Sequence, residues 1–102
     1  MKTIQVREWK DLTKKEKEKA RERKTDYFIE AELEILGLEL EKKVITEDEY
    51  YEKLGCSKVY AESTSWFIPA CYYEKHKKEI DKFVLEELKG EVFDRFAEPI
   101  IV

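Results

Sequence analysis

Side chains with nucleophilic or acid–base chemistry gather in one segment, between Gly55 and His76. Cys71 is expected just inside the start of a helix, where the positive end of the helix dipole favours the thiolate form of a nucleophile. His76, the only histidine, lies about 140° further around that helix, so the two side chains cannot pair as nucleophile and base within it. A small enzyme or ligand-binding domain using Cys71 and His76 is therefore an alternative that requires tertiary folding. Its further components would be the hydroxyl side chains of Ser63, Thr64 and Ser65.

Common catalytic and metal-binding signatures do not occur in the sequence, which contains no GxSxG, HExxH, P-loop or GxGxxG pattern. Cys56 and Cys71 have no CxxC spacing, and with no apolar export signal at Met1 we expect both thiols to be reduced. A zinc site would need both thiols, His76 and a carboxylate at no standard spacing. We therefore predict no metal, no cofactor and no catalytic residue.

Charge is unevenly distributed along a chain whose formal net charge is −4. Eight basic and four acidic residues lie between Lys10 and Lys24, whereas nine acidic and two basic residues lie between Glu30 and Glu52. One interpretation is a set of solvated helix faces with opposite charges at neighbouring positions. The other is that the acidic stretch imitates a phosphate backbone and meets the basic surface of a partner. Its candidate binding residues are Glu47, Asp48, Glu49 and Glu52.

Aromatic side chains are concentrated in the same segment as the thiols. Trp66, Phe67 and Ile68 either dock a helix on the sheet or form an exposed recognition surface, and the exposure of Trp66 distinguishes the two. Tyr72 and Tyr73 point to different sides of a helix, so at most one belongs to the core. The other is a candidate contact residue, because tyrosine offers a large contact area at a small entropic cost. The candidate binding residues in this segment are Trp66, Tyr72, Tyr73 and His76.

The first half of the chain predicts a strand and two helices. Thr3–Trp9 alternates apolar and polar side chains, which is typical of a short strand. Thr13 and Glu16 form a capping box at the start of a long charged helix. A second capping box begins a short helix over Thr46–Leu54, which Gly55 ends.

The second half predicts one further helix between extended segments. Residues 58–68 contain several β-branched and aromatic residues and are expected to be extended. Pro69 is well placed at the start of a helix over residues 70–88, and Gly90 ends it. Short strands beside the N-terminal one are expected at residues 92–93 and 100–102.

The long helix carries two apolar rows, which a single packing layer cannot bury. One row is Ala20, Tyr27, Phe28, Ala31, Ile35 and Leu38, and the opposite row is Ile29, Leu33, Leu36 and Leu40. The helix is either sandwiched within the fold, or pairs through the second row as a homodimer, or stops near Gly37. We favour the stop, with Leu38–Glu41 continuing as a strand, because glycine commonly ends helices.

These elements define the fold class. The length of 102 residues is typical of one domain, and three glycines and two prolines are few for an all-β sandwich or barrel. No apolar run approaches the roughly 18 residues that span a bilayer. We therefore expect a mainly helical α+β protein, a single domain over residues 1–102 with three helices and a small sheet of short strands.

Two regions resemble a family of small phage and mobile-element proteins without an assigned activity. The head, Lys2 to Arg21, is similar to the KTIxVxxxxxLxxxxKEKAR opening of such proteins. The stretch Gly55 to Asp81, which reads GCSKVYAESTSWFIPACYYEKHKKEID, is similar to the tail of one group of them. Together the two regions cover about half of the chain. The resemblance implies an intracellular, phage-like setting and transfers no catalytic residues.

The absence of an assembled reactive centre favours a binding function over an enzymatic one. We expect a phage or mobile-element accessory protein in the host cytoplasm that binds a host protein or a protein–nucleic-acid complex. An acidic surface of this kind could occupy the basic channel that a nuclease uses for nucleic acid, as an anti-CRISPR-like inhibitor. The alternatives are the Cys71/His76 enzyme and a structural homodimer.

Overall fold

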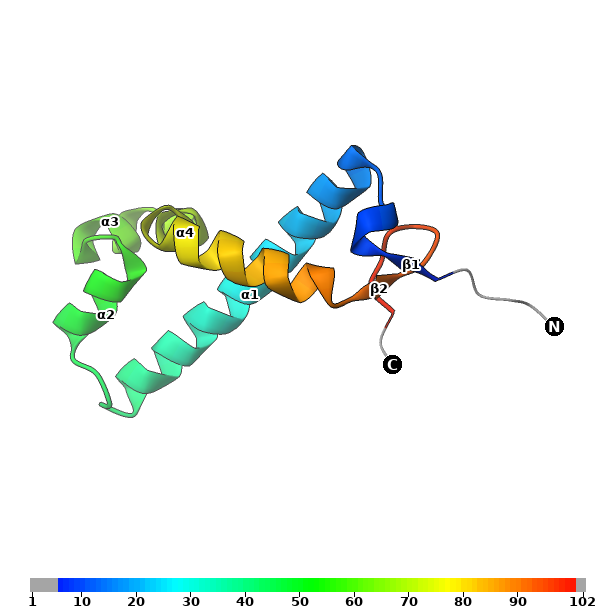
Figure 1. The fold of residues 1–102 in the computed structure, drawn as a ribbon. Helices are drawn as coiled ribbons and strands as arrows, with labels where there is room; N and C mark the ends of the chain where they lie inside the picture. The colour runs from blue at the N-terminus through cyan, green and yellow to red at the C-terminus, as the bar shows by residue number, and fades with distance from the viewer. Residues whose placement is uncertain (1–5, 101–102) are drawn as a thin grey trace.

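Within residues 6–100, the part of the chain that the computed structural model describes, four α-helices and two short strands follow one another (Figure 1). This is the mainly helical α+β fold that the sequence predicts, with one α-helix more than expected. Helices α1 and α4 cross, with α2 and α3 at one end of the molecule and the sheet at the other. The elements are β1 (Arg7–Glu8), the 3-10 turn η1 (Trp9–Asp11), α1 (Lys14–Glu41), α2 (Glu47–Leu54), α3 (Lys58–Ser63), the 3-10 turn η2 (Ser65–Phe67), α4 (Ile68–Lys89) and β2 (Val92–Phe93).

Helix α1 begins at the predicted capping box. The backbone N–H of Glu16 donates to Thr13 Oγ1 at 3.2 Å, and the backbone N–H of Thr13 donates to Glu16 Oε1 at 3.1 Å. The two bonds satisfy N–H groups that the first turn of a helix leaves without partners. This part of the prediction is confirmed.

The expected stop of α1 at Gly37 is wrong, as is the strand expected at Leu38–Glu41, because the helix continues to Glu41. Glycine inside a helix costs about 1 kcal/mol relative to alanine. Leu40, which lies beyond Gly37 in the helix, packs against the buried cluster. Its partial burial contributes on the order of 1 kcal/mol and offsets that cost. The chain turns away from the helix axis at Lys43 instead, whose φ is 60°.

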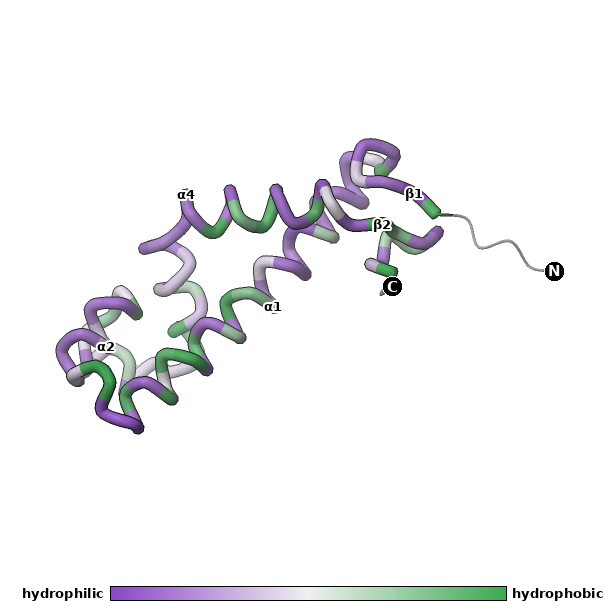
Figure 2. Tube along the Cα trace, turned by 60° about the horizontal axis from the view of Figure 1, so that its bottom comes forward, coloured by the Kyte–Doolittle hydropathy of each residue, from purple (hydrophilic) through white to green (hydrophobic). Residues whose placement is uncertain are grey.

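The two apolar rows of α1 have different surroundings. In the second row Ile29 and Leu36 are buried, and Leu33 and Leu40 pack against them inside the molecule. Much of this row is therefore used in the core of a single chain, which does not support the alternative of a homodimer formed through it. The first row is largely exposed beyond Ala20, with Tyr27 74% exposed. Ala20 lies about 180° around the helix from Ile29, and both are buried, so the two halves of α1 bury different sides. Hydrophobic residues recur along the second half of its trace (Figure 2).

The segment from Thr46 to Phe67 is more helical than predicted. Helix α2 has the expected Thr46 cap and ends at Gly55 in the left-handed region. Residues 58–68, expected to be extended, instead form α3 and η2. The hydroxyl of Ser57 accepts the N–H of Tyr60 at 3.2 Å, and Ala61 is buried. This cap and the burial favour a short helix over the extended conformation that β-branched and aromatic residues prefer.

Helix α4 and the sheet follow the prediction closely. The helix has Pro69 in its first turn and ends at Gly90. Strands β1 and β2 are antiparallel, with Arg7 opposite Phe93, and the N–H of Ile100 donates to the carbonyl of Val92 at 2.9 Å. The strand expected over Thr3–Trp9 is shorter, because Trp9 already belongs to η1. Residues 3–5 of that strand and residues 101–102 of the last one lie outside the described residues.

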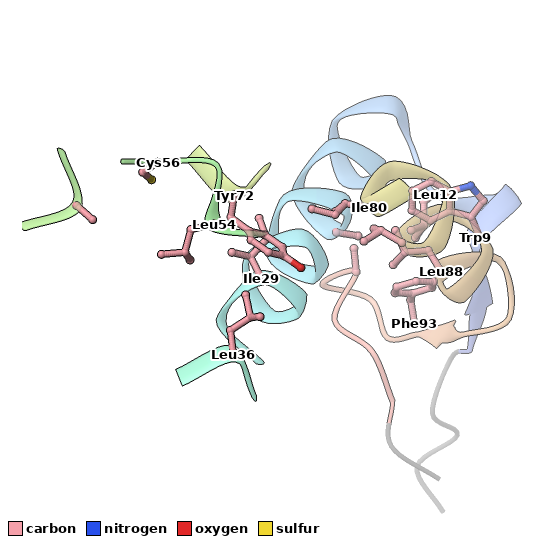
Figure 3. Close-up of a cluster of buried hydrophobic side chains, with 14 of the residues drawn as sticks. Trp9, Leu12, Ile29, Leu36, Leu54, Cys56, Tyr72, Ile80, Leu88 and Phe93 are labelled. Carbon is pink, nitrogen blue, oxygen red and sulfur yellow. The ribbon is translucent and has the colours of Figure 1, made fainter. Parts of the chain in front are cut away.

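The buried side chains form one cluster that follows the long axis of the molecule (Figure 3). One end, near the sheet, contains Trp9, Leu12, Leu88 and Phe93, and the other contains Ile29, Leu36, Leu54, Cys56 and Tyr72. Arg7 fixes the sheet to α1, since its guanidinium donates to both carboxylate oxygens of Glu16 at 2.8 and 3.1 Å and to the carbonyl of Asp94 at 2.9 Å.

Candidate interaction surface

An open groove of about 690 Å³ lies where α2, α3 and the first turns of α4 meet. A Cβ at Gly55 would lie 3.0 Å from Lys75 Cβ and 3.2 Å from the carbonyl oxygen of Cys71. The glycine therefore allows the end of α2 to approach α4. We call this the α2–α4 groove, and its lining residues are Tyr51, Glu52, Gly55, Tyr60, Phe67, Ala70, Cys71, Glu74 and Lys75.

Trp66 and Phe67 form an exposed aromatic pair beside this groove. Their ring centroids are 3.6 Å apart at an interplanar angle of 33°, and 72% of Trp66 and 39% of Phe67 are exposed. The expectation that these rings dock a helix on the sheet is wrong, because the sheet lies at the opposite end of the molecule. Only Ile68 of this trio packs against the core. Of the two readings of this segment, its exposure favours the recognition surface.

Trp66 also lines a second groove, which we call the α1–α4 groove. One wall comes from α1 and includes Glu18, Glu22 and Asp26, and the other comes from η2 and α4 and includes Trp66 and Tyr73. The aromatic pair therefore stands between two grooves, with Phe67 in the α2–α4 groove and Trp66 in the α1–α4 groove.

The two neighbouring tyrosines of α4 point to different sides, as predicted. Tyr72 belongs to the core, and its burial raises the pKa of its hydroxyl. Tyr72 is therefore not the contact residue that the sequence suggested. Tyr73 is half-buried, and its hydroxyl donates to Asp81 Oδ1 at 2.8 Å, which raises the pKa of Tyr73.

His76 has a structural environment between α2 and α4. Its Nε2 lies 2.8 Å from the carbonyl oxygen of Lys53, and its ring centroid is 4.5 Å from that of Tyr72. The backbone of His76 is non-helical, with φ −111° and ψ 18°, and marks a kink in α4. The hydrogen bond from Tyr73 to Asp81 spans this kink. His76 thus connects α4 to the end of α2 rather than presenting a free imidazole to a partner.

The thiols and hydroxyls of this segment have local partners of their own. Burial, and then a hydrogen bond with Cys71, raise the pKa of Cys56 to about 11. The hydroxyl of Ser63 donates to the carbonyl of Val59, and that of Thr64 to the carbonyl of Tyr60, each at 2.8 Å. Both cysteines are free thiols. The thiols and hydroxyls that the alternative enzyme would use are therefore bonded to different local partners and not to one another as a catalytic set.

The four acidic candidates on α2 divide into two structural and two available carboxylates. Glu49 completes the capping box with Thr46, and Glu47 forms an ion pair with Lys58 at 2.7 Å. Asp48 and Glu52 are exposed, and among the described residues neither carboxylate takes part in an ion pair. The acidic surface of α2 is thus smaller than the sequence alone suggests.

Sequence reasoning missed two exposed side chains on α3. Val59 is 75% exposed and Tyr60 43% exposed, and Tyr60 lines the α2–α4 groove beside Phe67. Interpreting residues 58–68 as extended hid this helix. Ser57, a strong N-cap residue placed just before Lys58, is the signal that could have revealed it.

Comparison of the chain with protein-family models, with curated proteins and with solved structures finds no match. Within residues 6–100, no three His, Cys, Asp or Glu side chains are grouped so that they could hold a metal ion. None of the helices in this range is both long enough and apolar enough to span a bilayer.

Proposed function

We propose that the protein works by binding, as a stoichiometric ligand of a host protein or of a protein–nucleic-acid complex. The observation that carries this proposal is the exposure of the Trp66–Phe67 pair between two grooves. Burying the exposed parts of both rings would remove about 250 Å² of apolar surface from water, a gain of about 6 kcal/mol before the entropic costs of association. Exposed aromatic anchors of this kind are typical of the residues that dominate binding energy at interfaces.

The charge of the surrounding surface supports a basic partner. The second half of α1 and the whole of α2 form a helical hairpin, and this region carries the acidic stretch from Glu30 to Glu52. Asp48 and Glu52 are free to meet cationic side chains there. Complementary charge accelerates association and suppresses binding to nucleic acid itself, which carries the same sign.

The setting we propose is the cytoplasm of a cell that carries a phage or mobile element. It follows from the resemblance of the head and tail segments to small phage proteins. In that setting an acidic, non-enzymatic ligand would act as an anti-defence inhibitor of the anti-CRISPR kind, occupying the basic channel through which a nuclease holds nucleic acid.

The proposal is tested by affinity capture with the full chain, followed by titration of the purified partner. Trp66→Ala should weaken binding at least about 30-fold, as expected for loss of an aromatic hot spot of about 2 kcal/mol. Phe96→Ala is the matched control, because Phe96 is 64% exposed and lies three residues after β2. A partner whose affinity falls equally in both variants, or in neither, would contradict the proposed surface.

A charge reversal tests the acidic part of the proposal separately. The double variant Asp48→Lys/Glu52→Lys spares the carboxylates that cap or pair within the fold, and Glu86→Lys/Glu87→Lys applies the same change to exposed positions of α4. We expect the first double variant alone to slow association, and added salt to reduce the difference. If neither added salt nor the charge reversal on α2 changes the association rate of the complex, the proposal that the partner is basic is refuted.

A further inference from the structure

The α1–α4 groove extends along α1 beyond the part that Trp66 lines. An adjoining hollow shares Asp26, Ile29 and Pro69 with it and continues along α1 to Glu30 and Leu33. The two hollows therefore form one continuous groove between α1 and the start of α4. Apolar side chains make up its floor and one wall, since Ile29, Leu33, Pro69 and Trp66 all line it.

Carboxylates follow the α1 wall of this groove at a constant interval. Glu18, Glu22, Asp26 and Glu30 are each four residues apart, so they rise by about 6 Å per step along the helix. All four are exposed, and among residues 6–100 none of them takes part in an ion pair. Like charges at this spacing destabilise an isolated helix. The row itself is therefore repulsive, while its first three members also have basic neighbours three or four residues away, namely Lys14, Lys15, Lys19, Arg21 and Arg23.

The opposite wall supplies aromatic surface to the same groove. Trp66 is 72% exposed, and an exposed tryptophan ring attracts cations to its face. The groove contains one cationic side chain, Arg21, against the four carboxylates of the row and Asp81. The carboxylates of the groove would repel anionic ligands such as nucleic acid. A cationic occupant would be attracted both by the carboxylates of α1 and by the ring of Trp66.

We propose that this groove binds an extended, lysine- or arginine-rich peptide segment of the partner protein. In an extended chain, side chains on one face repeat about every 6.6–6.8 Å, which is close to the interval of the carboxylate row. Alternate basic side chains would face Glu18, Glu22, Asp26 and Glu30 in turn. The intervening residues would pack on Trp66, Pro69 and Ile29. This inference rests on the proposed function and specifies the chemistry of the partner.

The probe for this inference is a fluorescein-labelled decapeptide of alternating lysine and alanine, titrated with the full chain and followed by anisotropy. The test variant is Glu22→Gln/Asp26→Asn, and the control is Glu86→Gln/Glu87→Gln, which removes the same charge from exposed positions of α4. We expect the test variant to bind the peptide about three- to tenfold more weakly than the control does. A decapeptide of alternating glutamate and alanine should not bind.

Folding provides an internal check on the variant. Neutralising Glu22 and Asp26 relieves repulsion along the row and also removes their attraction to Lys19 and Arg23, three residues earlier. The thermal midpoint should therefore change little while binding falls. Absence of peptide binding, or an equal loss in test and control variants, would overturn the inference. If Trp66→Ala abolishes capture of the partner while Glu22→Gln/Asp26→Asn leaves it intact, the proposed binding function is supported. The inference that the groove binds a basic segment of the partner is then refuted.

Discussion

Replacing Gly37 with alanine tests how far α1 extends. Gly37 lies inside α1, and a Cβ built on it would meet no atom within 4 Å. Alanine at such a position adds no clash and reduces the conformational freedom of the unfolded chain. We expect Gly37→Ala to stabilise the protein by about 1 kcal/mol.

Gly55→Ala provides the matched contrast, because the same chemical change occurs in a different backbone conformation. Gly55 has a φ of +81°, and its Cβ would lie 3.0 Å from Lys75 Cβ. The left-handed conformation costs a residue with a Cβ about 1–2 kcal/mol, and the close contact with Lys75 and Cys71 adds to it. We expect a destabilisation of about 2–3 kcal/mol, so the two variants should differ by about 3–4 kcal/mol.

Thermal unfolding followed by circular dichroism at the helical minimum is a suitable assay. A change of 1 kcal/mol shifts the midpoint of a domain of this size by about 4–8 °C. The midpoint should therefore rise for Gly37→Ala and fall by more than twice as much for Gly55→Ala. A fall in the midpoint of Gly37→Ala would refute the reasoning, since it would indicate that Gly37 ends a helix in a left-handed conformation, as its sequence context alone suggests.

Three further predictions concern the core, the acid stability and the thiols. Leu54→Ala should lower the free energy of unfolding in a urea titration by about 2–5 kcal/mol, because Leu54 is fully buried. Leu38→Ala, at a 46% exposed position, should lower it much less. Equal losses would argue against the described core. A hydrogen bond from the Arg7 guanidinium holds the pKa of Glu16 at about 2, below the usual 4.5, so this contact contributes its full stability above about pH 4.5 and loses it as the pH falls toward 2. Arg7→Met should therefore flatten the acid-induced loss of stability over that range, and an unchanged profile would refute the pairing. Burial raises the pKa of Cys56 to about 11, so mass spectrometry should detect much slower iodoacetamide labelling of Cys56 at neutral pH in the folded chain than in urea, and similar rates would show that the thiol is accessible.

Local signals predicted most helix boundaries correctly. The caps at Thr13 and Thr46, the proline near the start of α4 and the glycines at positions 55 and 90 all lie where the structure begins or ends a helix. Each of these signals acts through hydrogen bonds or backbone angles within about four residues. They can therefore be read from neighbouring residues without knowledge of the fold.

The candidate surface was predicted less well. Trp66 is exposed, as a recognition surface requires, but Tyr72 is buried and His76 is bonded to the carbonyl of Lys53. Glu47 and Glu49 also have partners within the fold. The type of each residue was compatible with binding in every case. Whether a side chain is available depends on which other elements pack against it, and that information comes from distant parts of the chain.

The residues within one or two helical turns were thus sufficient to specify the caps, the charge asymmetry of α1 and the mainly helical class. The Ser57 cap of α3 is a further local signal, but local residues were insufficient to show that α1 continues through Gly37 or which apolar row of α1 faces inward. Those outcomes depend on the crossing of α4 over α1, which brings together side chains that are distant in the sequence, such as Phe28 and Phe83. The free energy of burying apolar surface between such elements exceeds local conformational preferences of about 1 kcal/mol, and it is set by the whole fold.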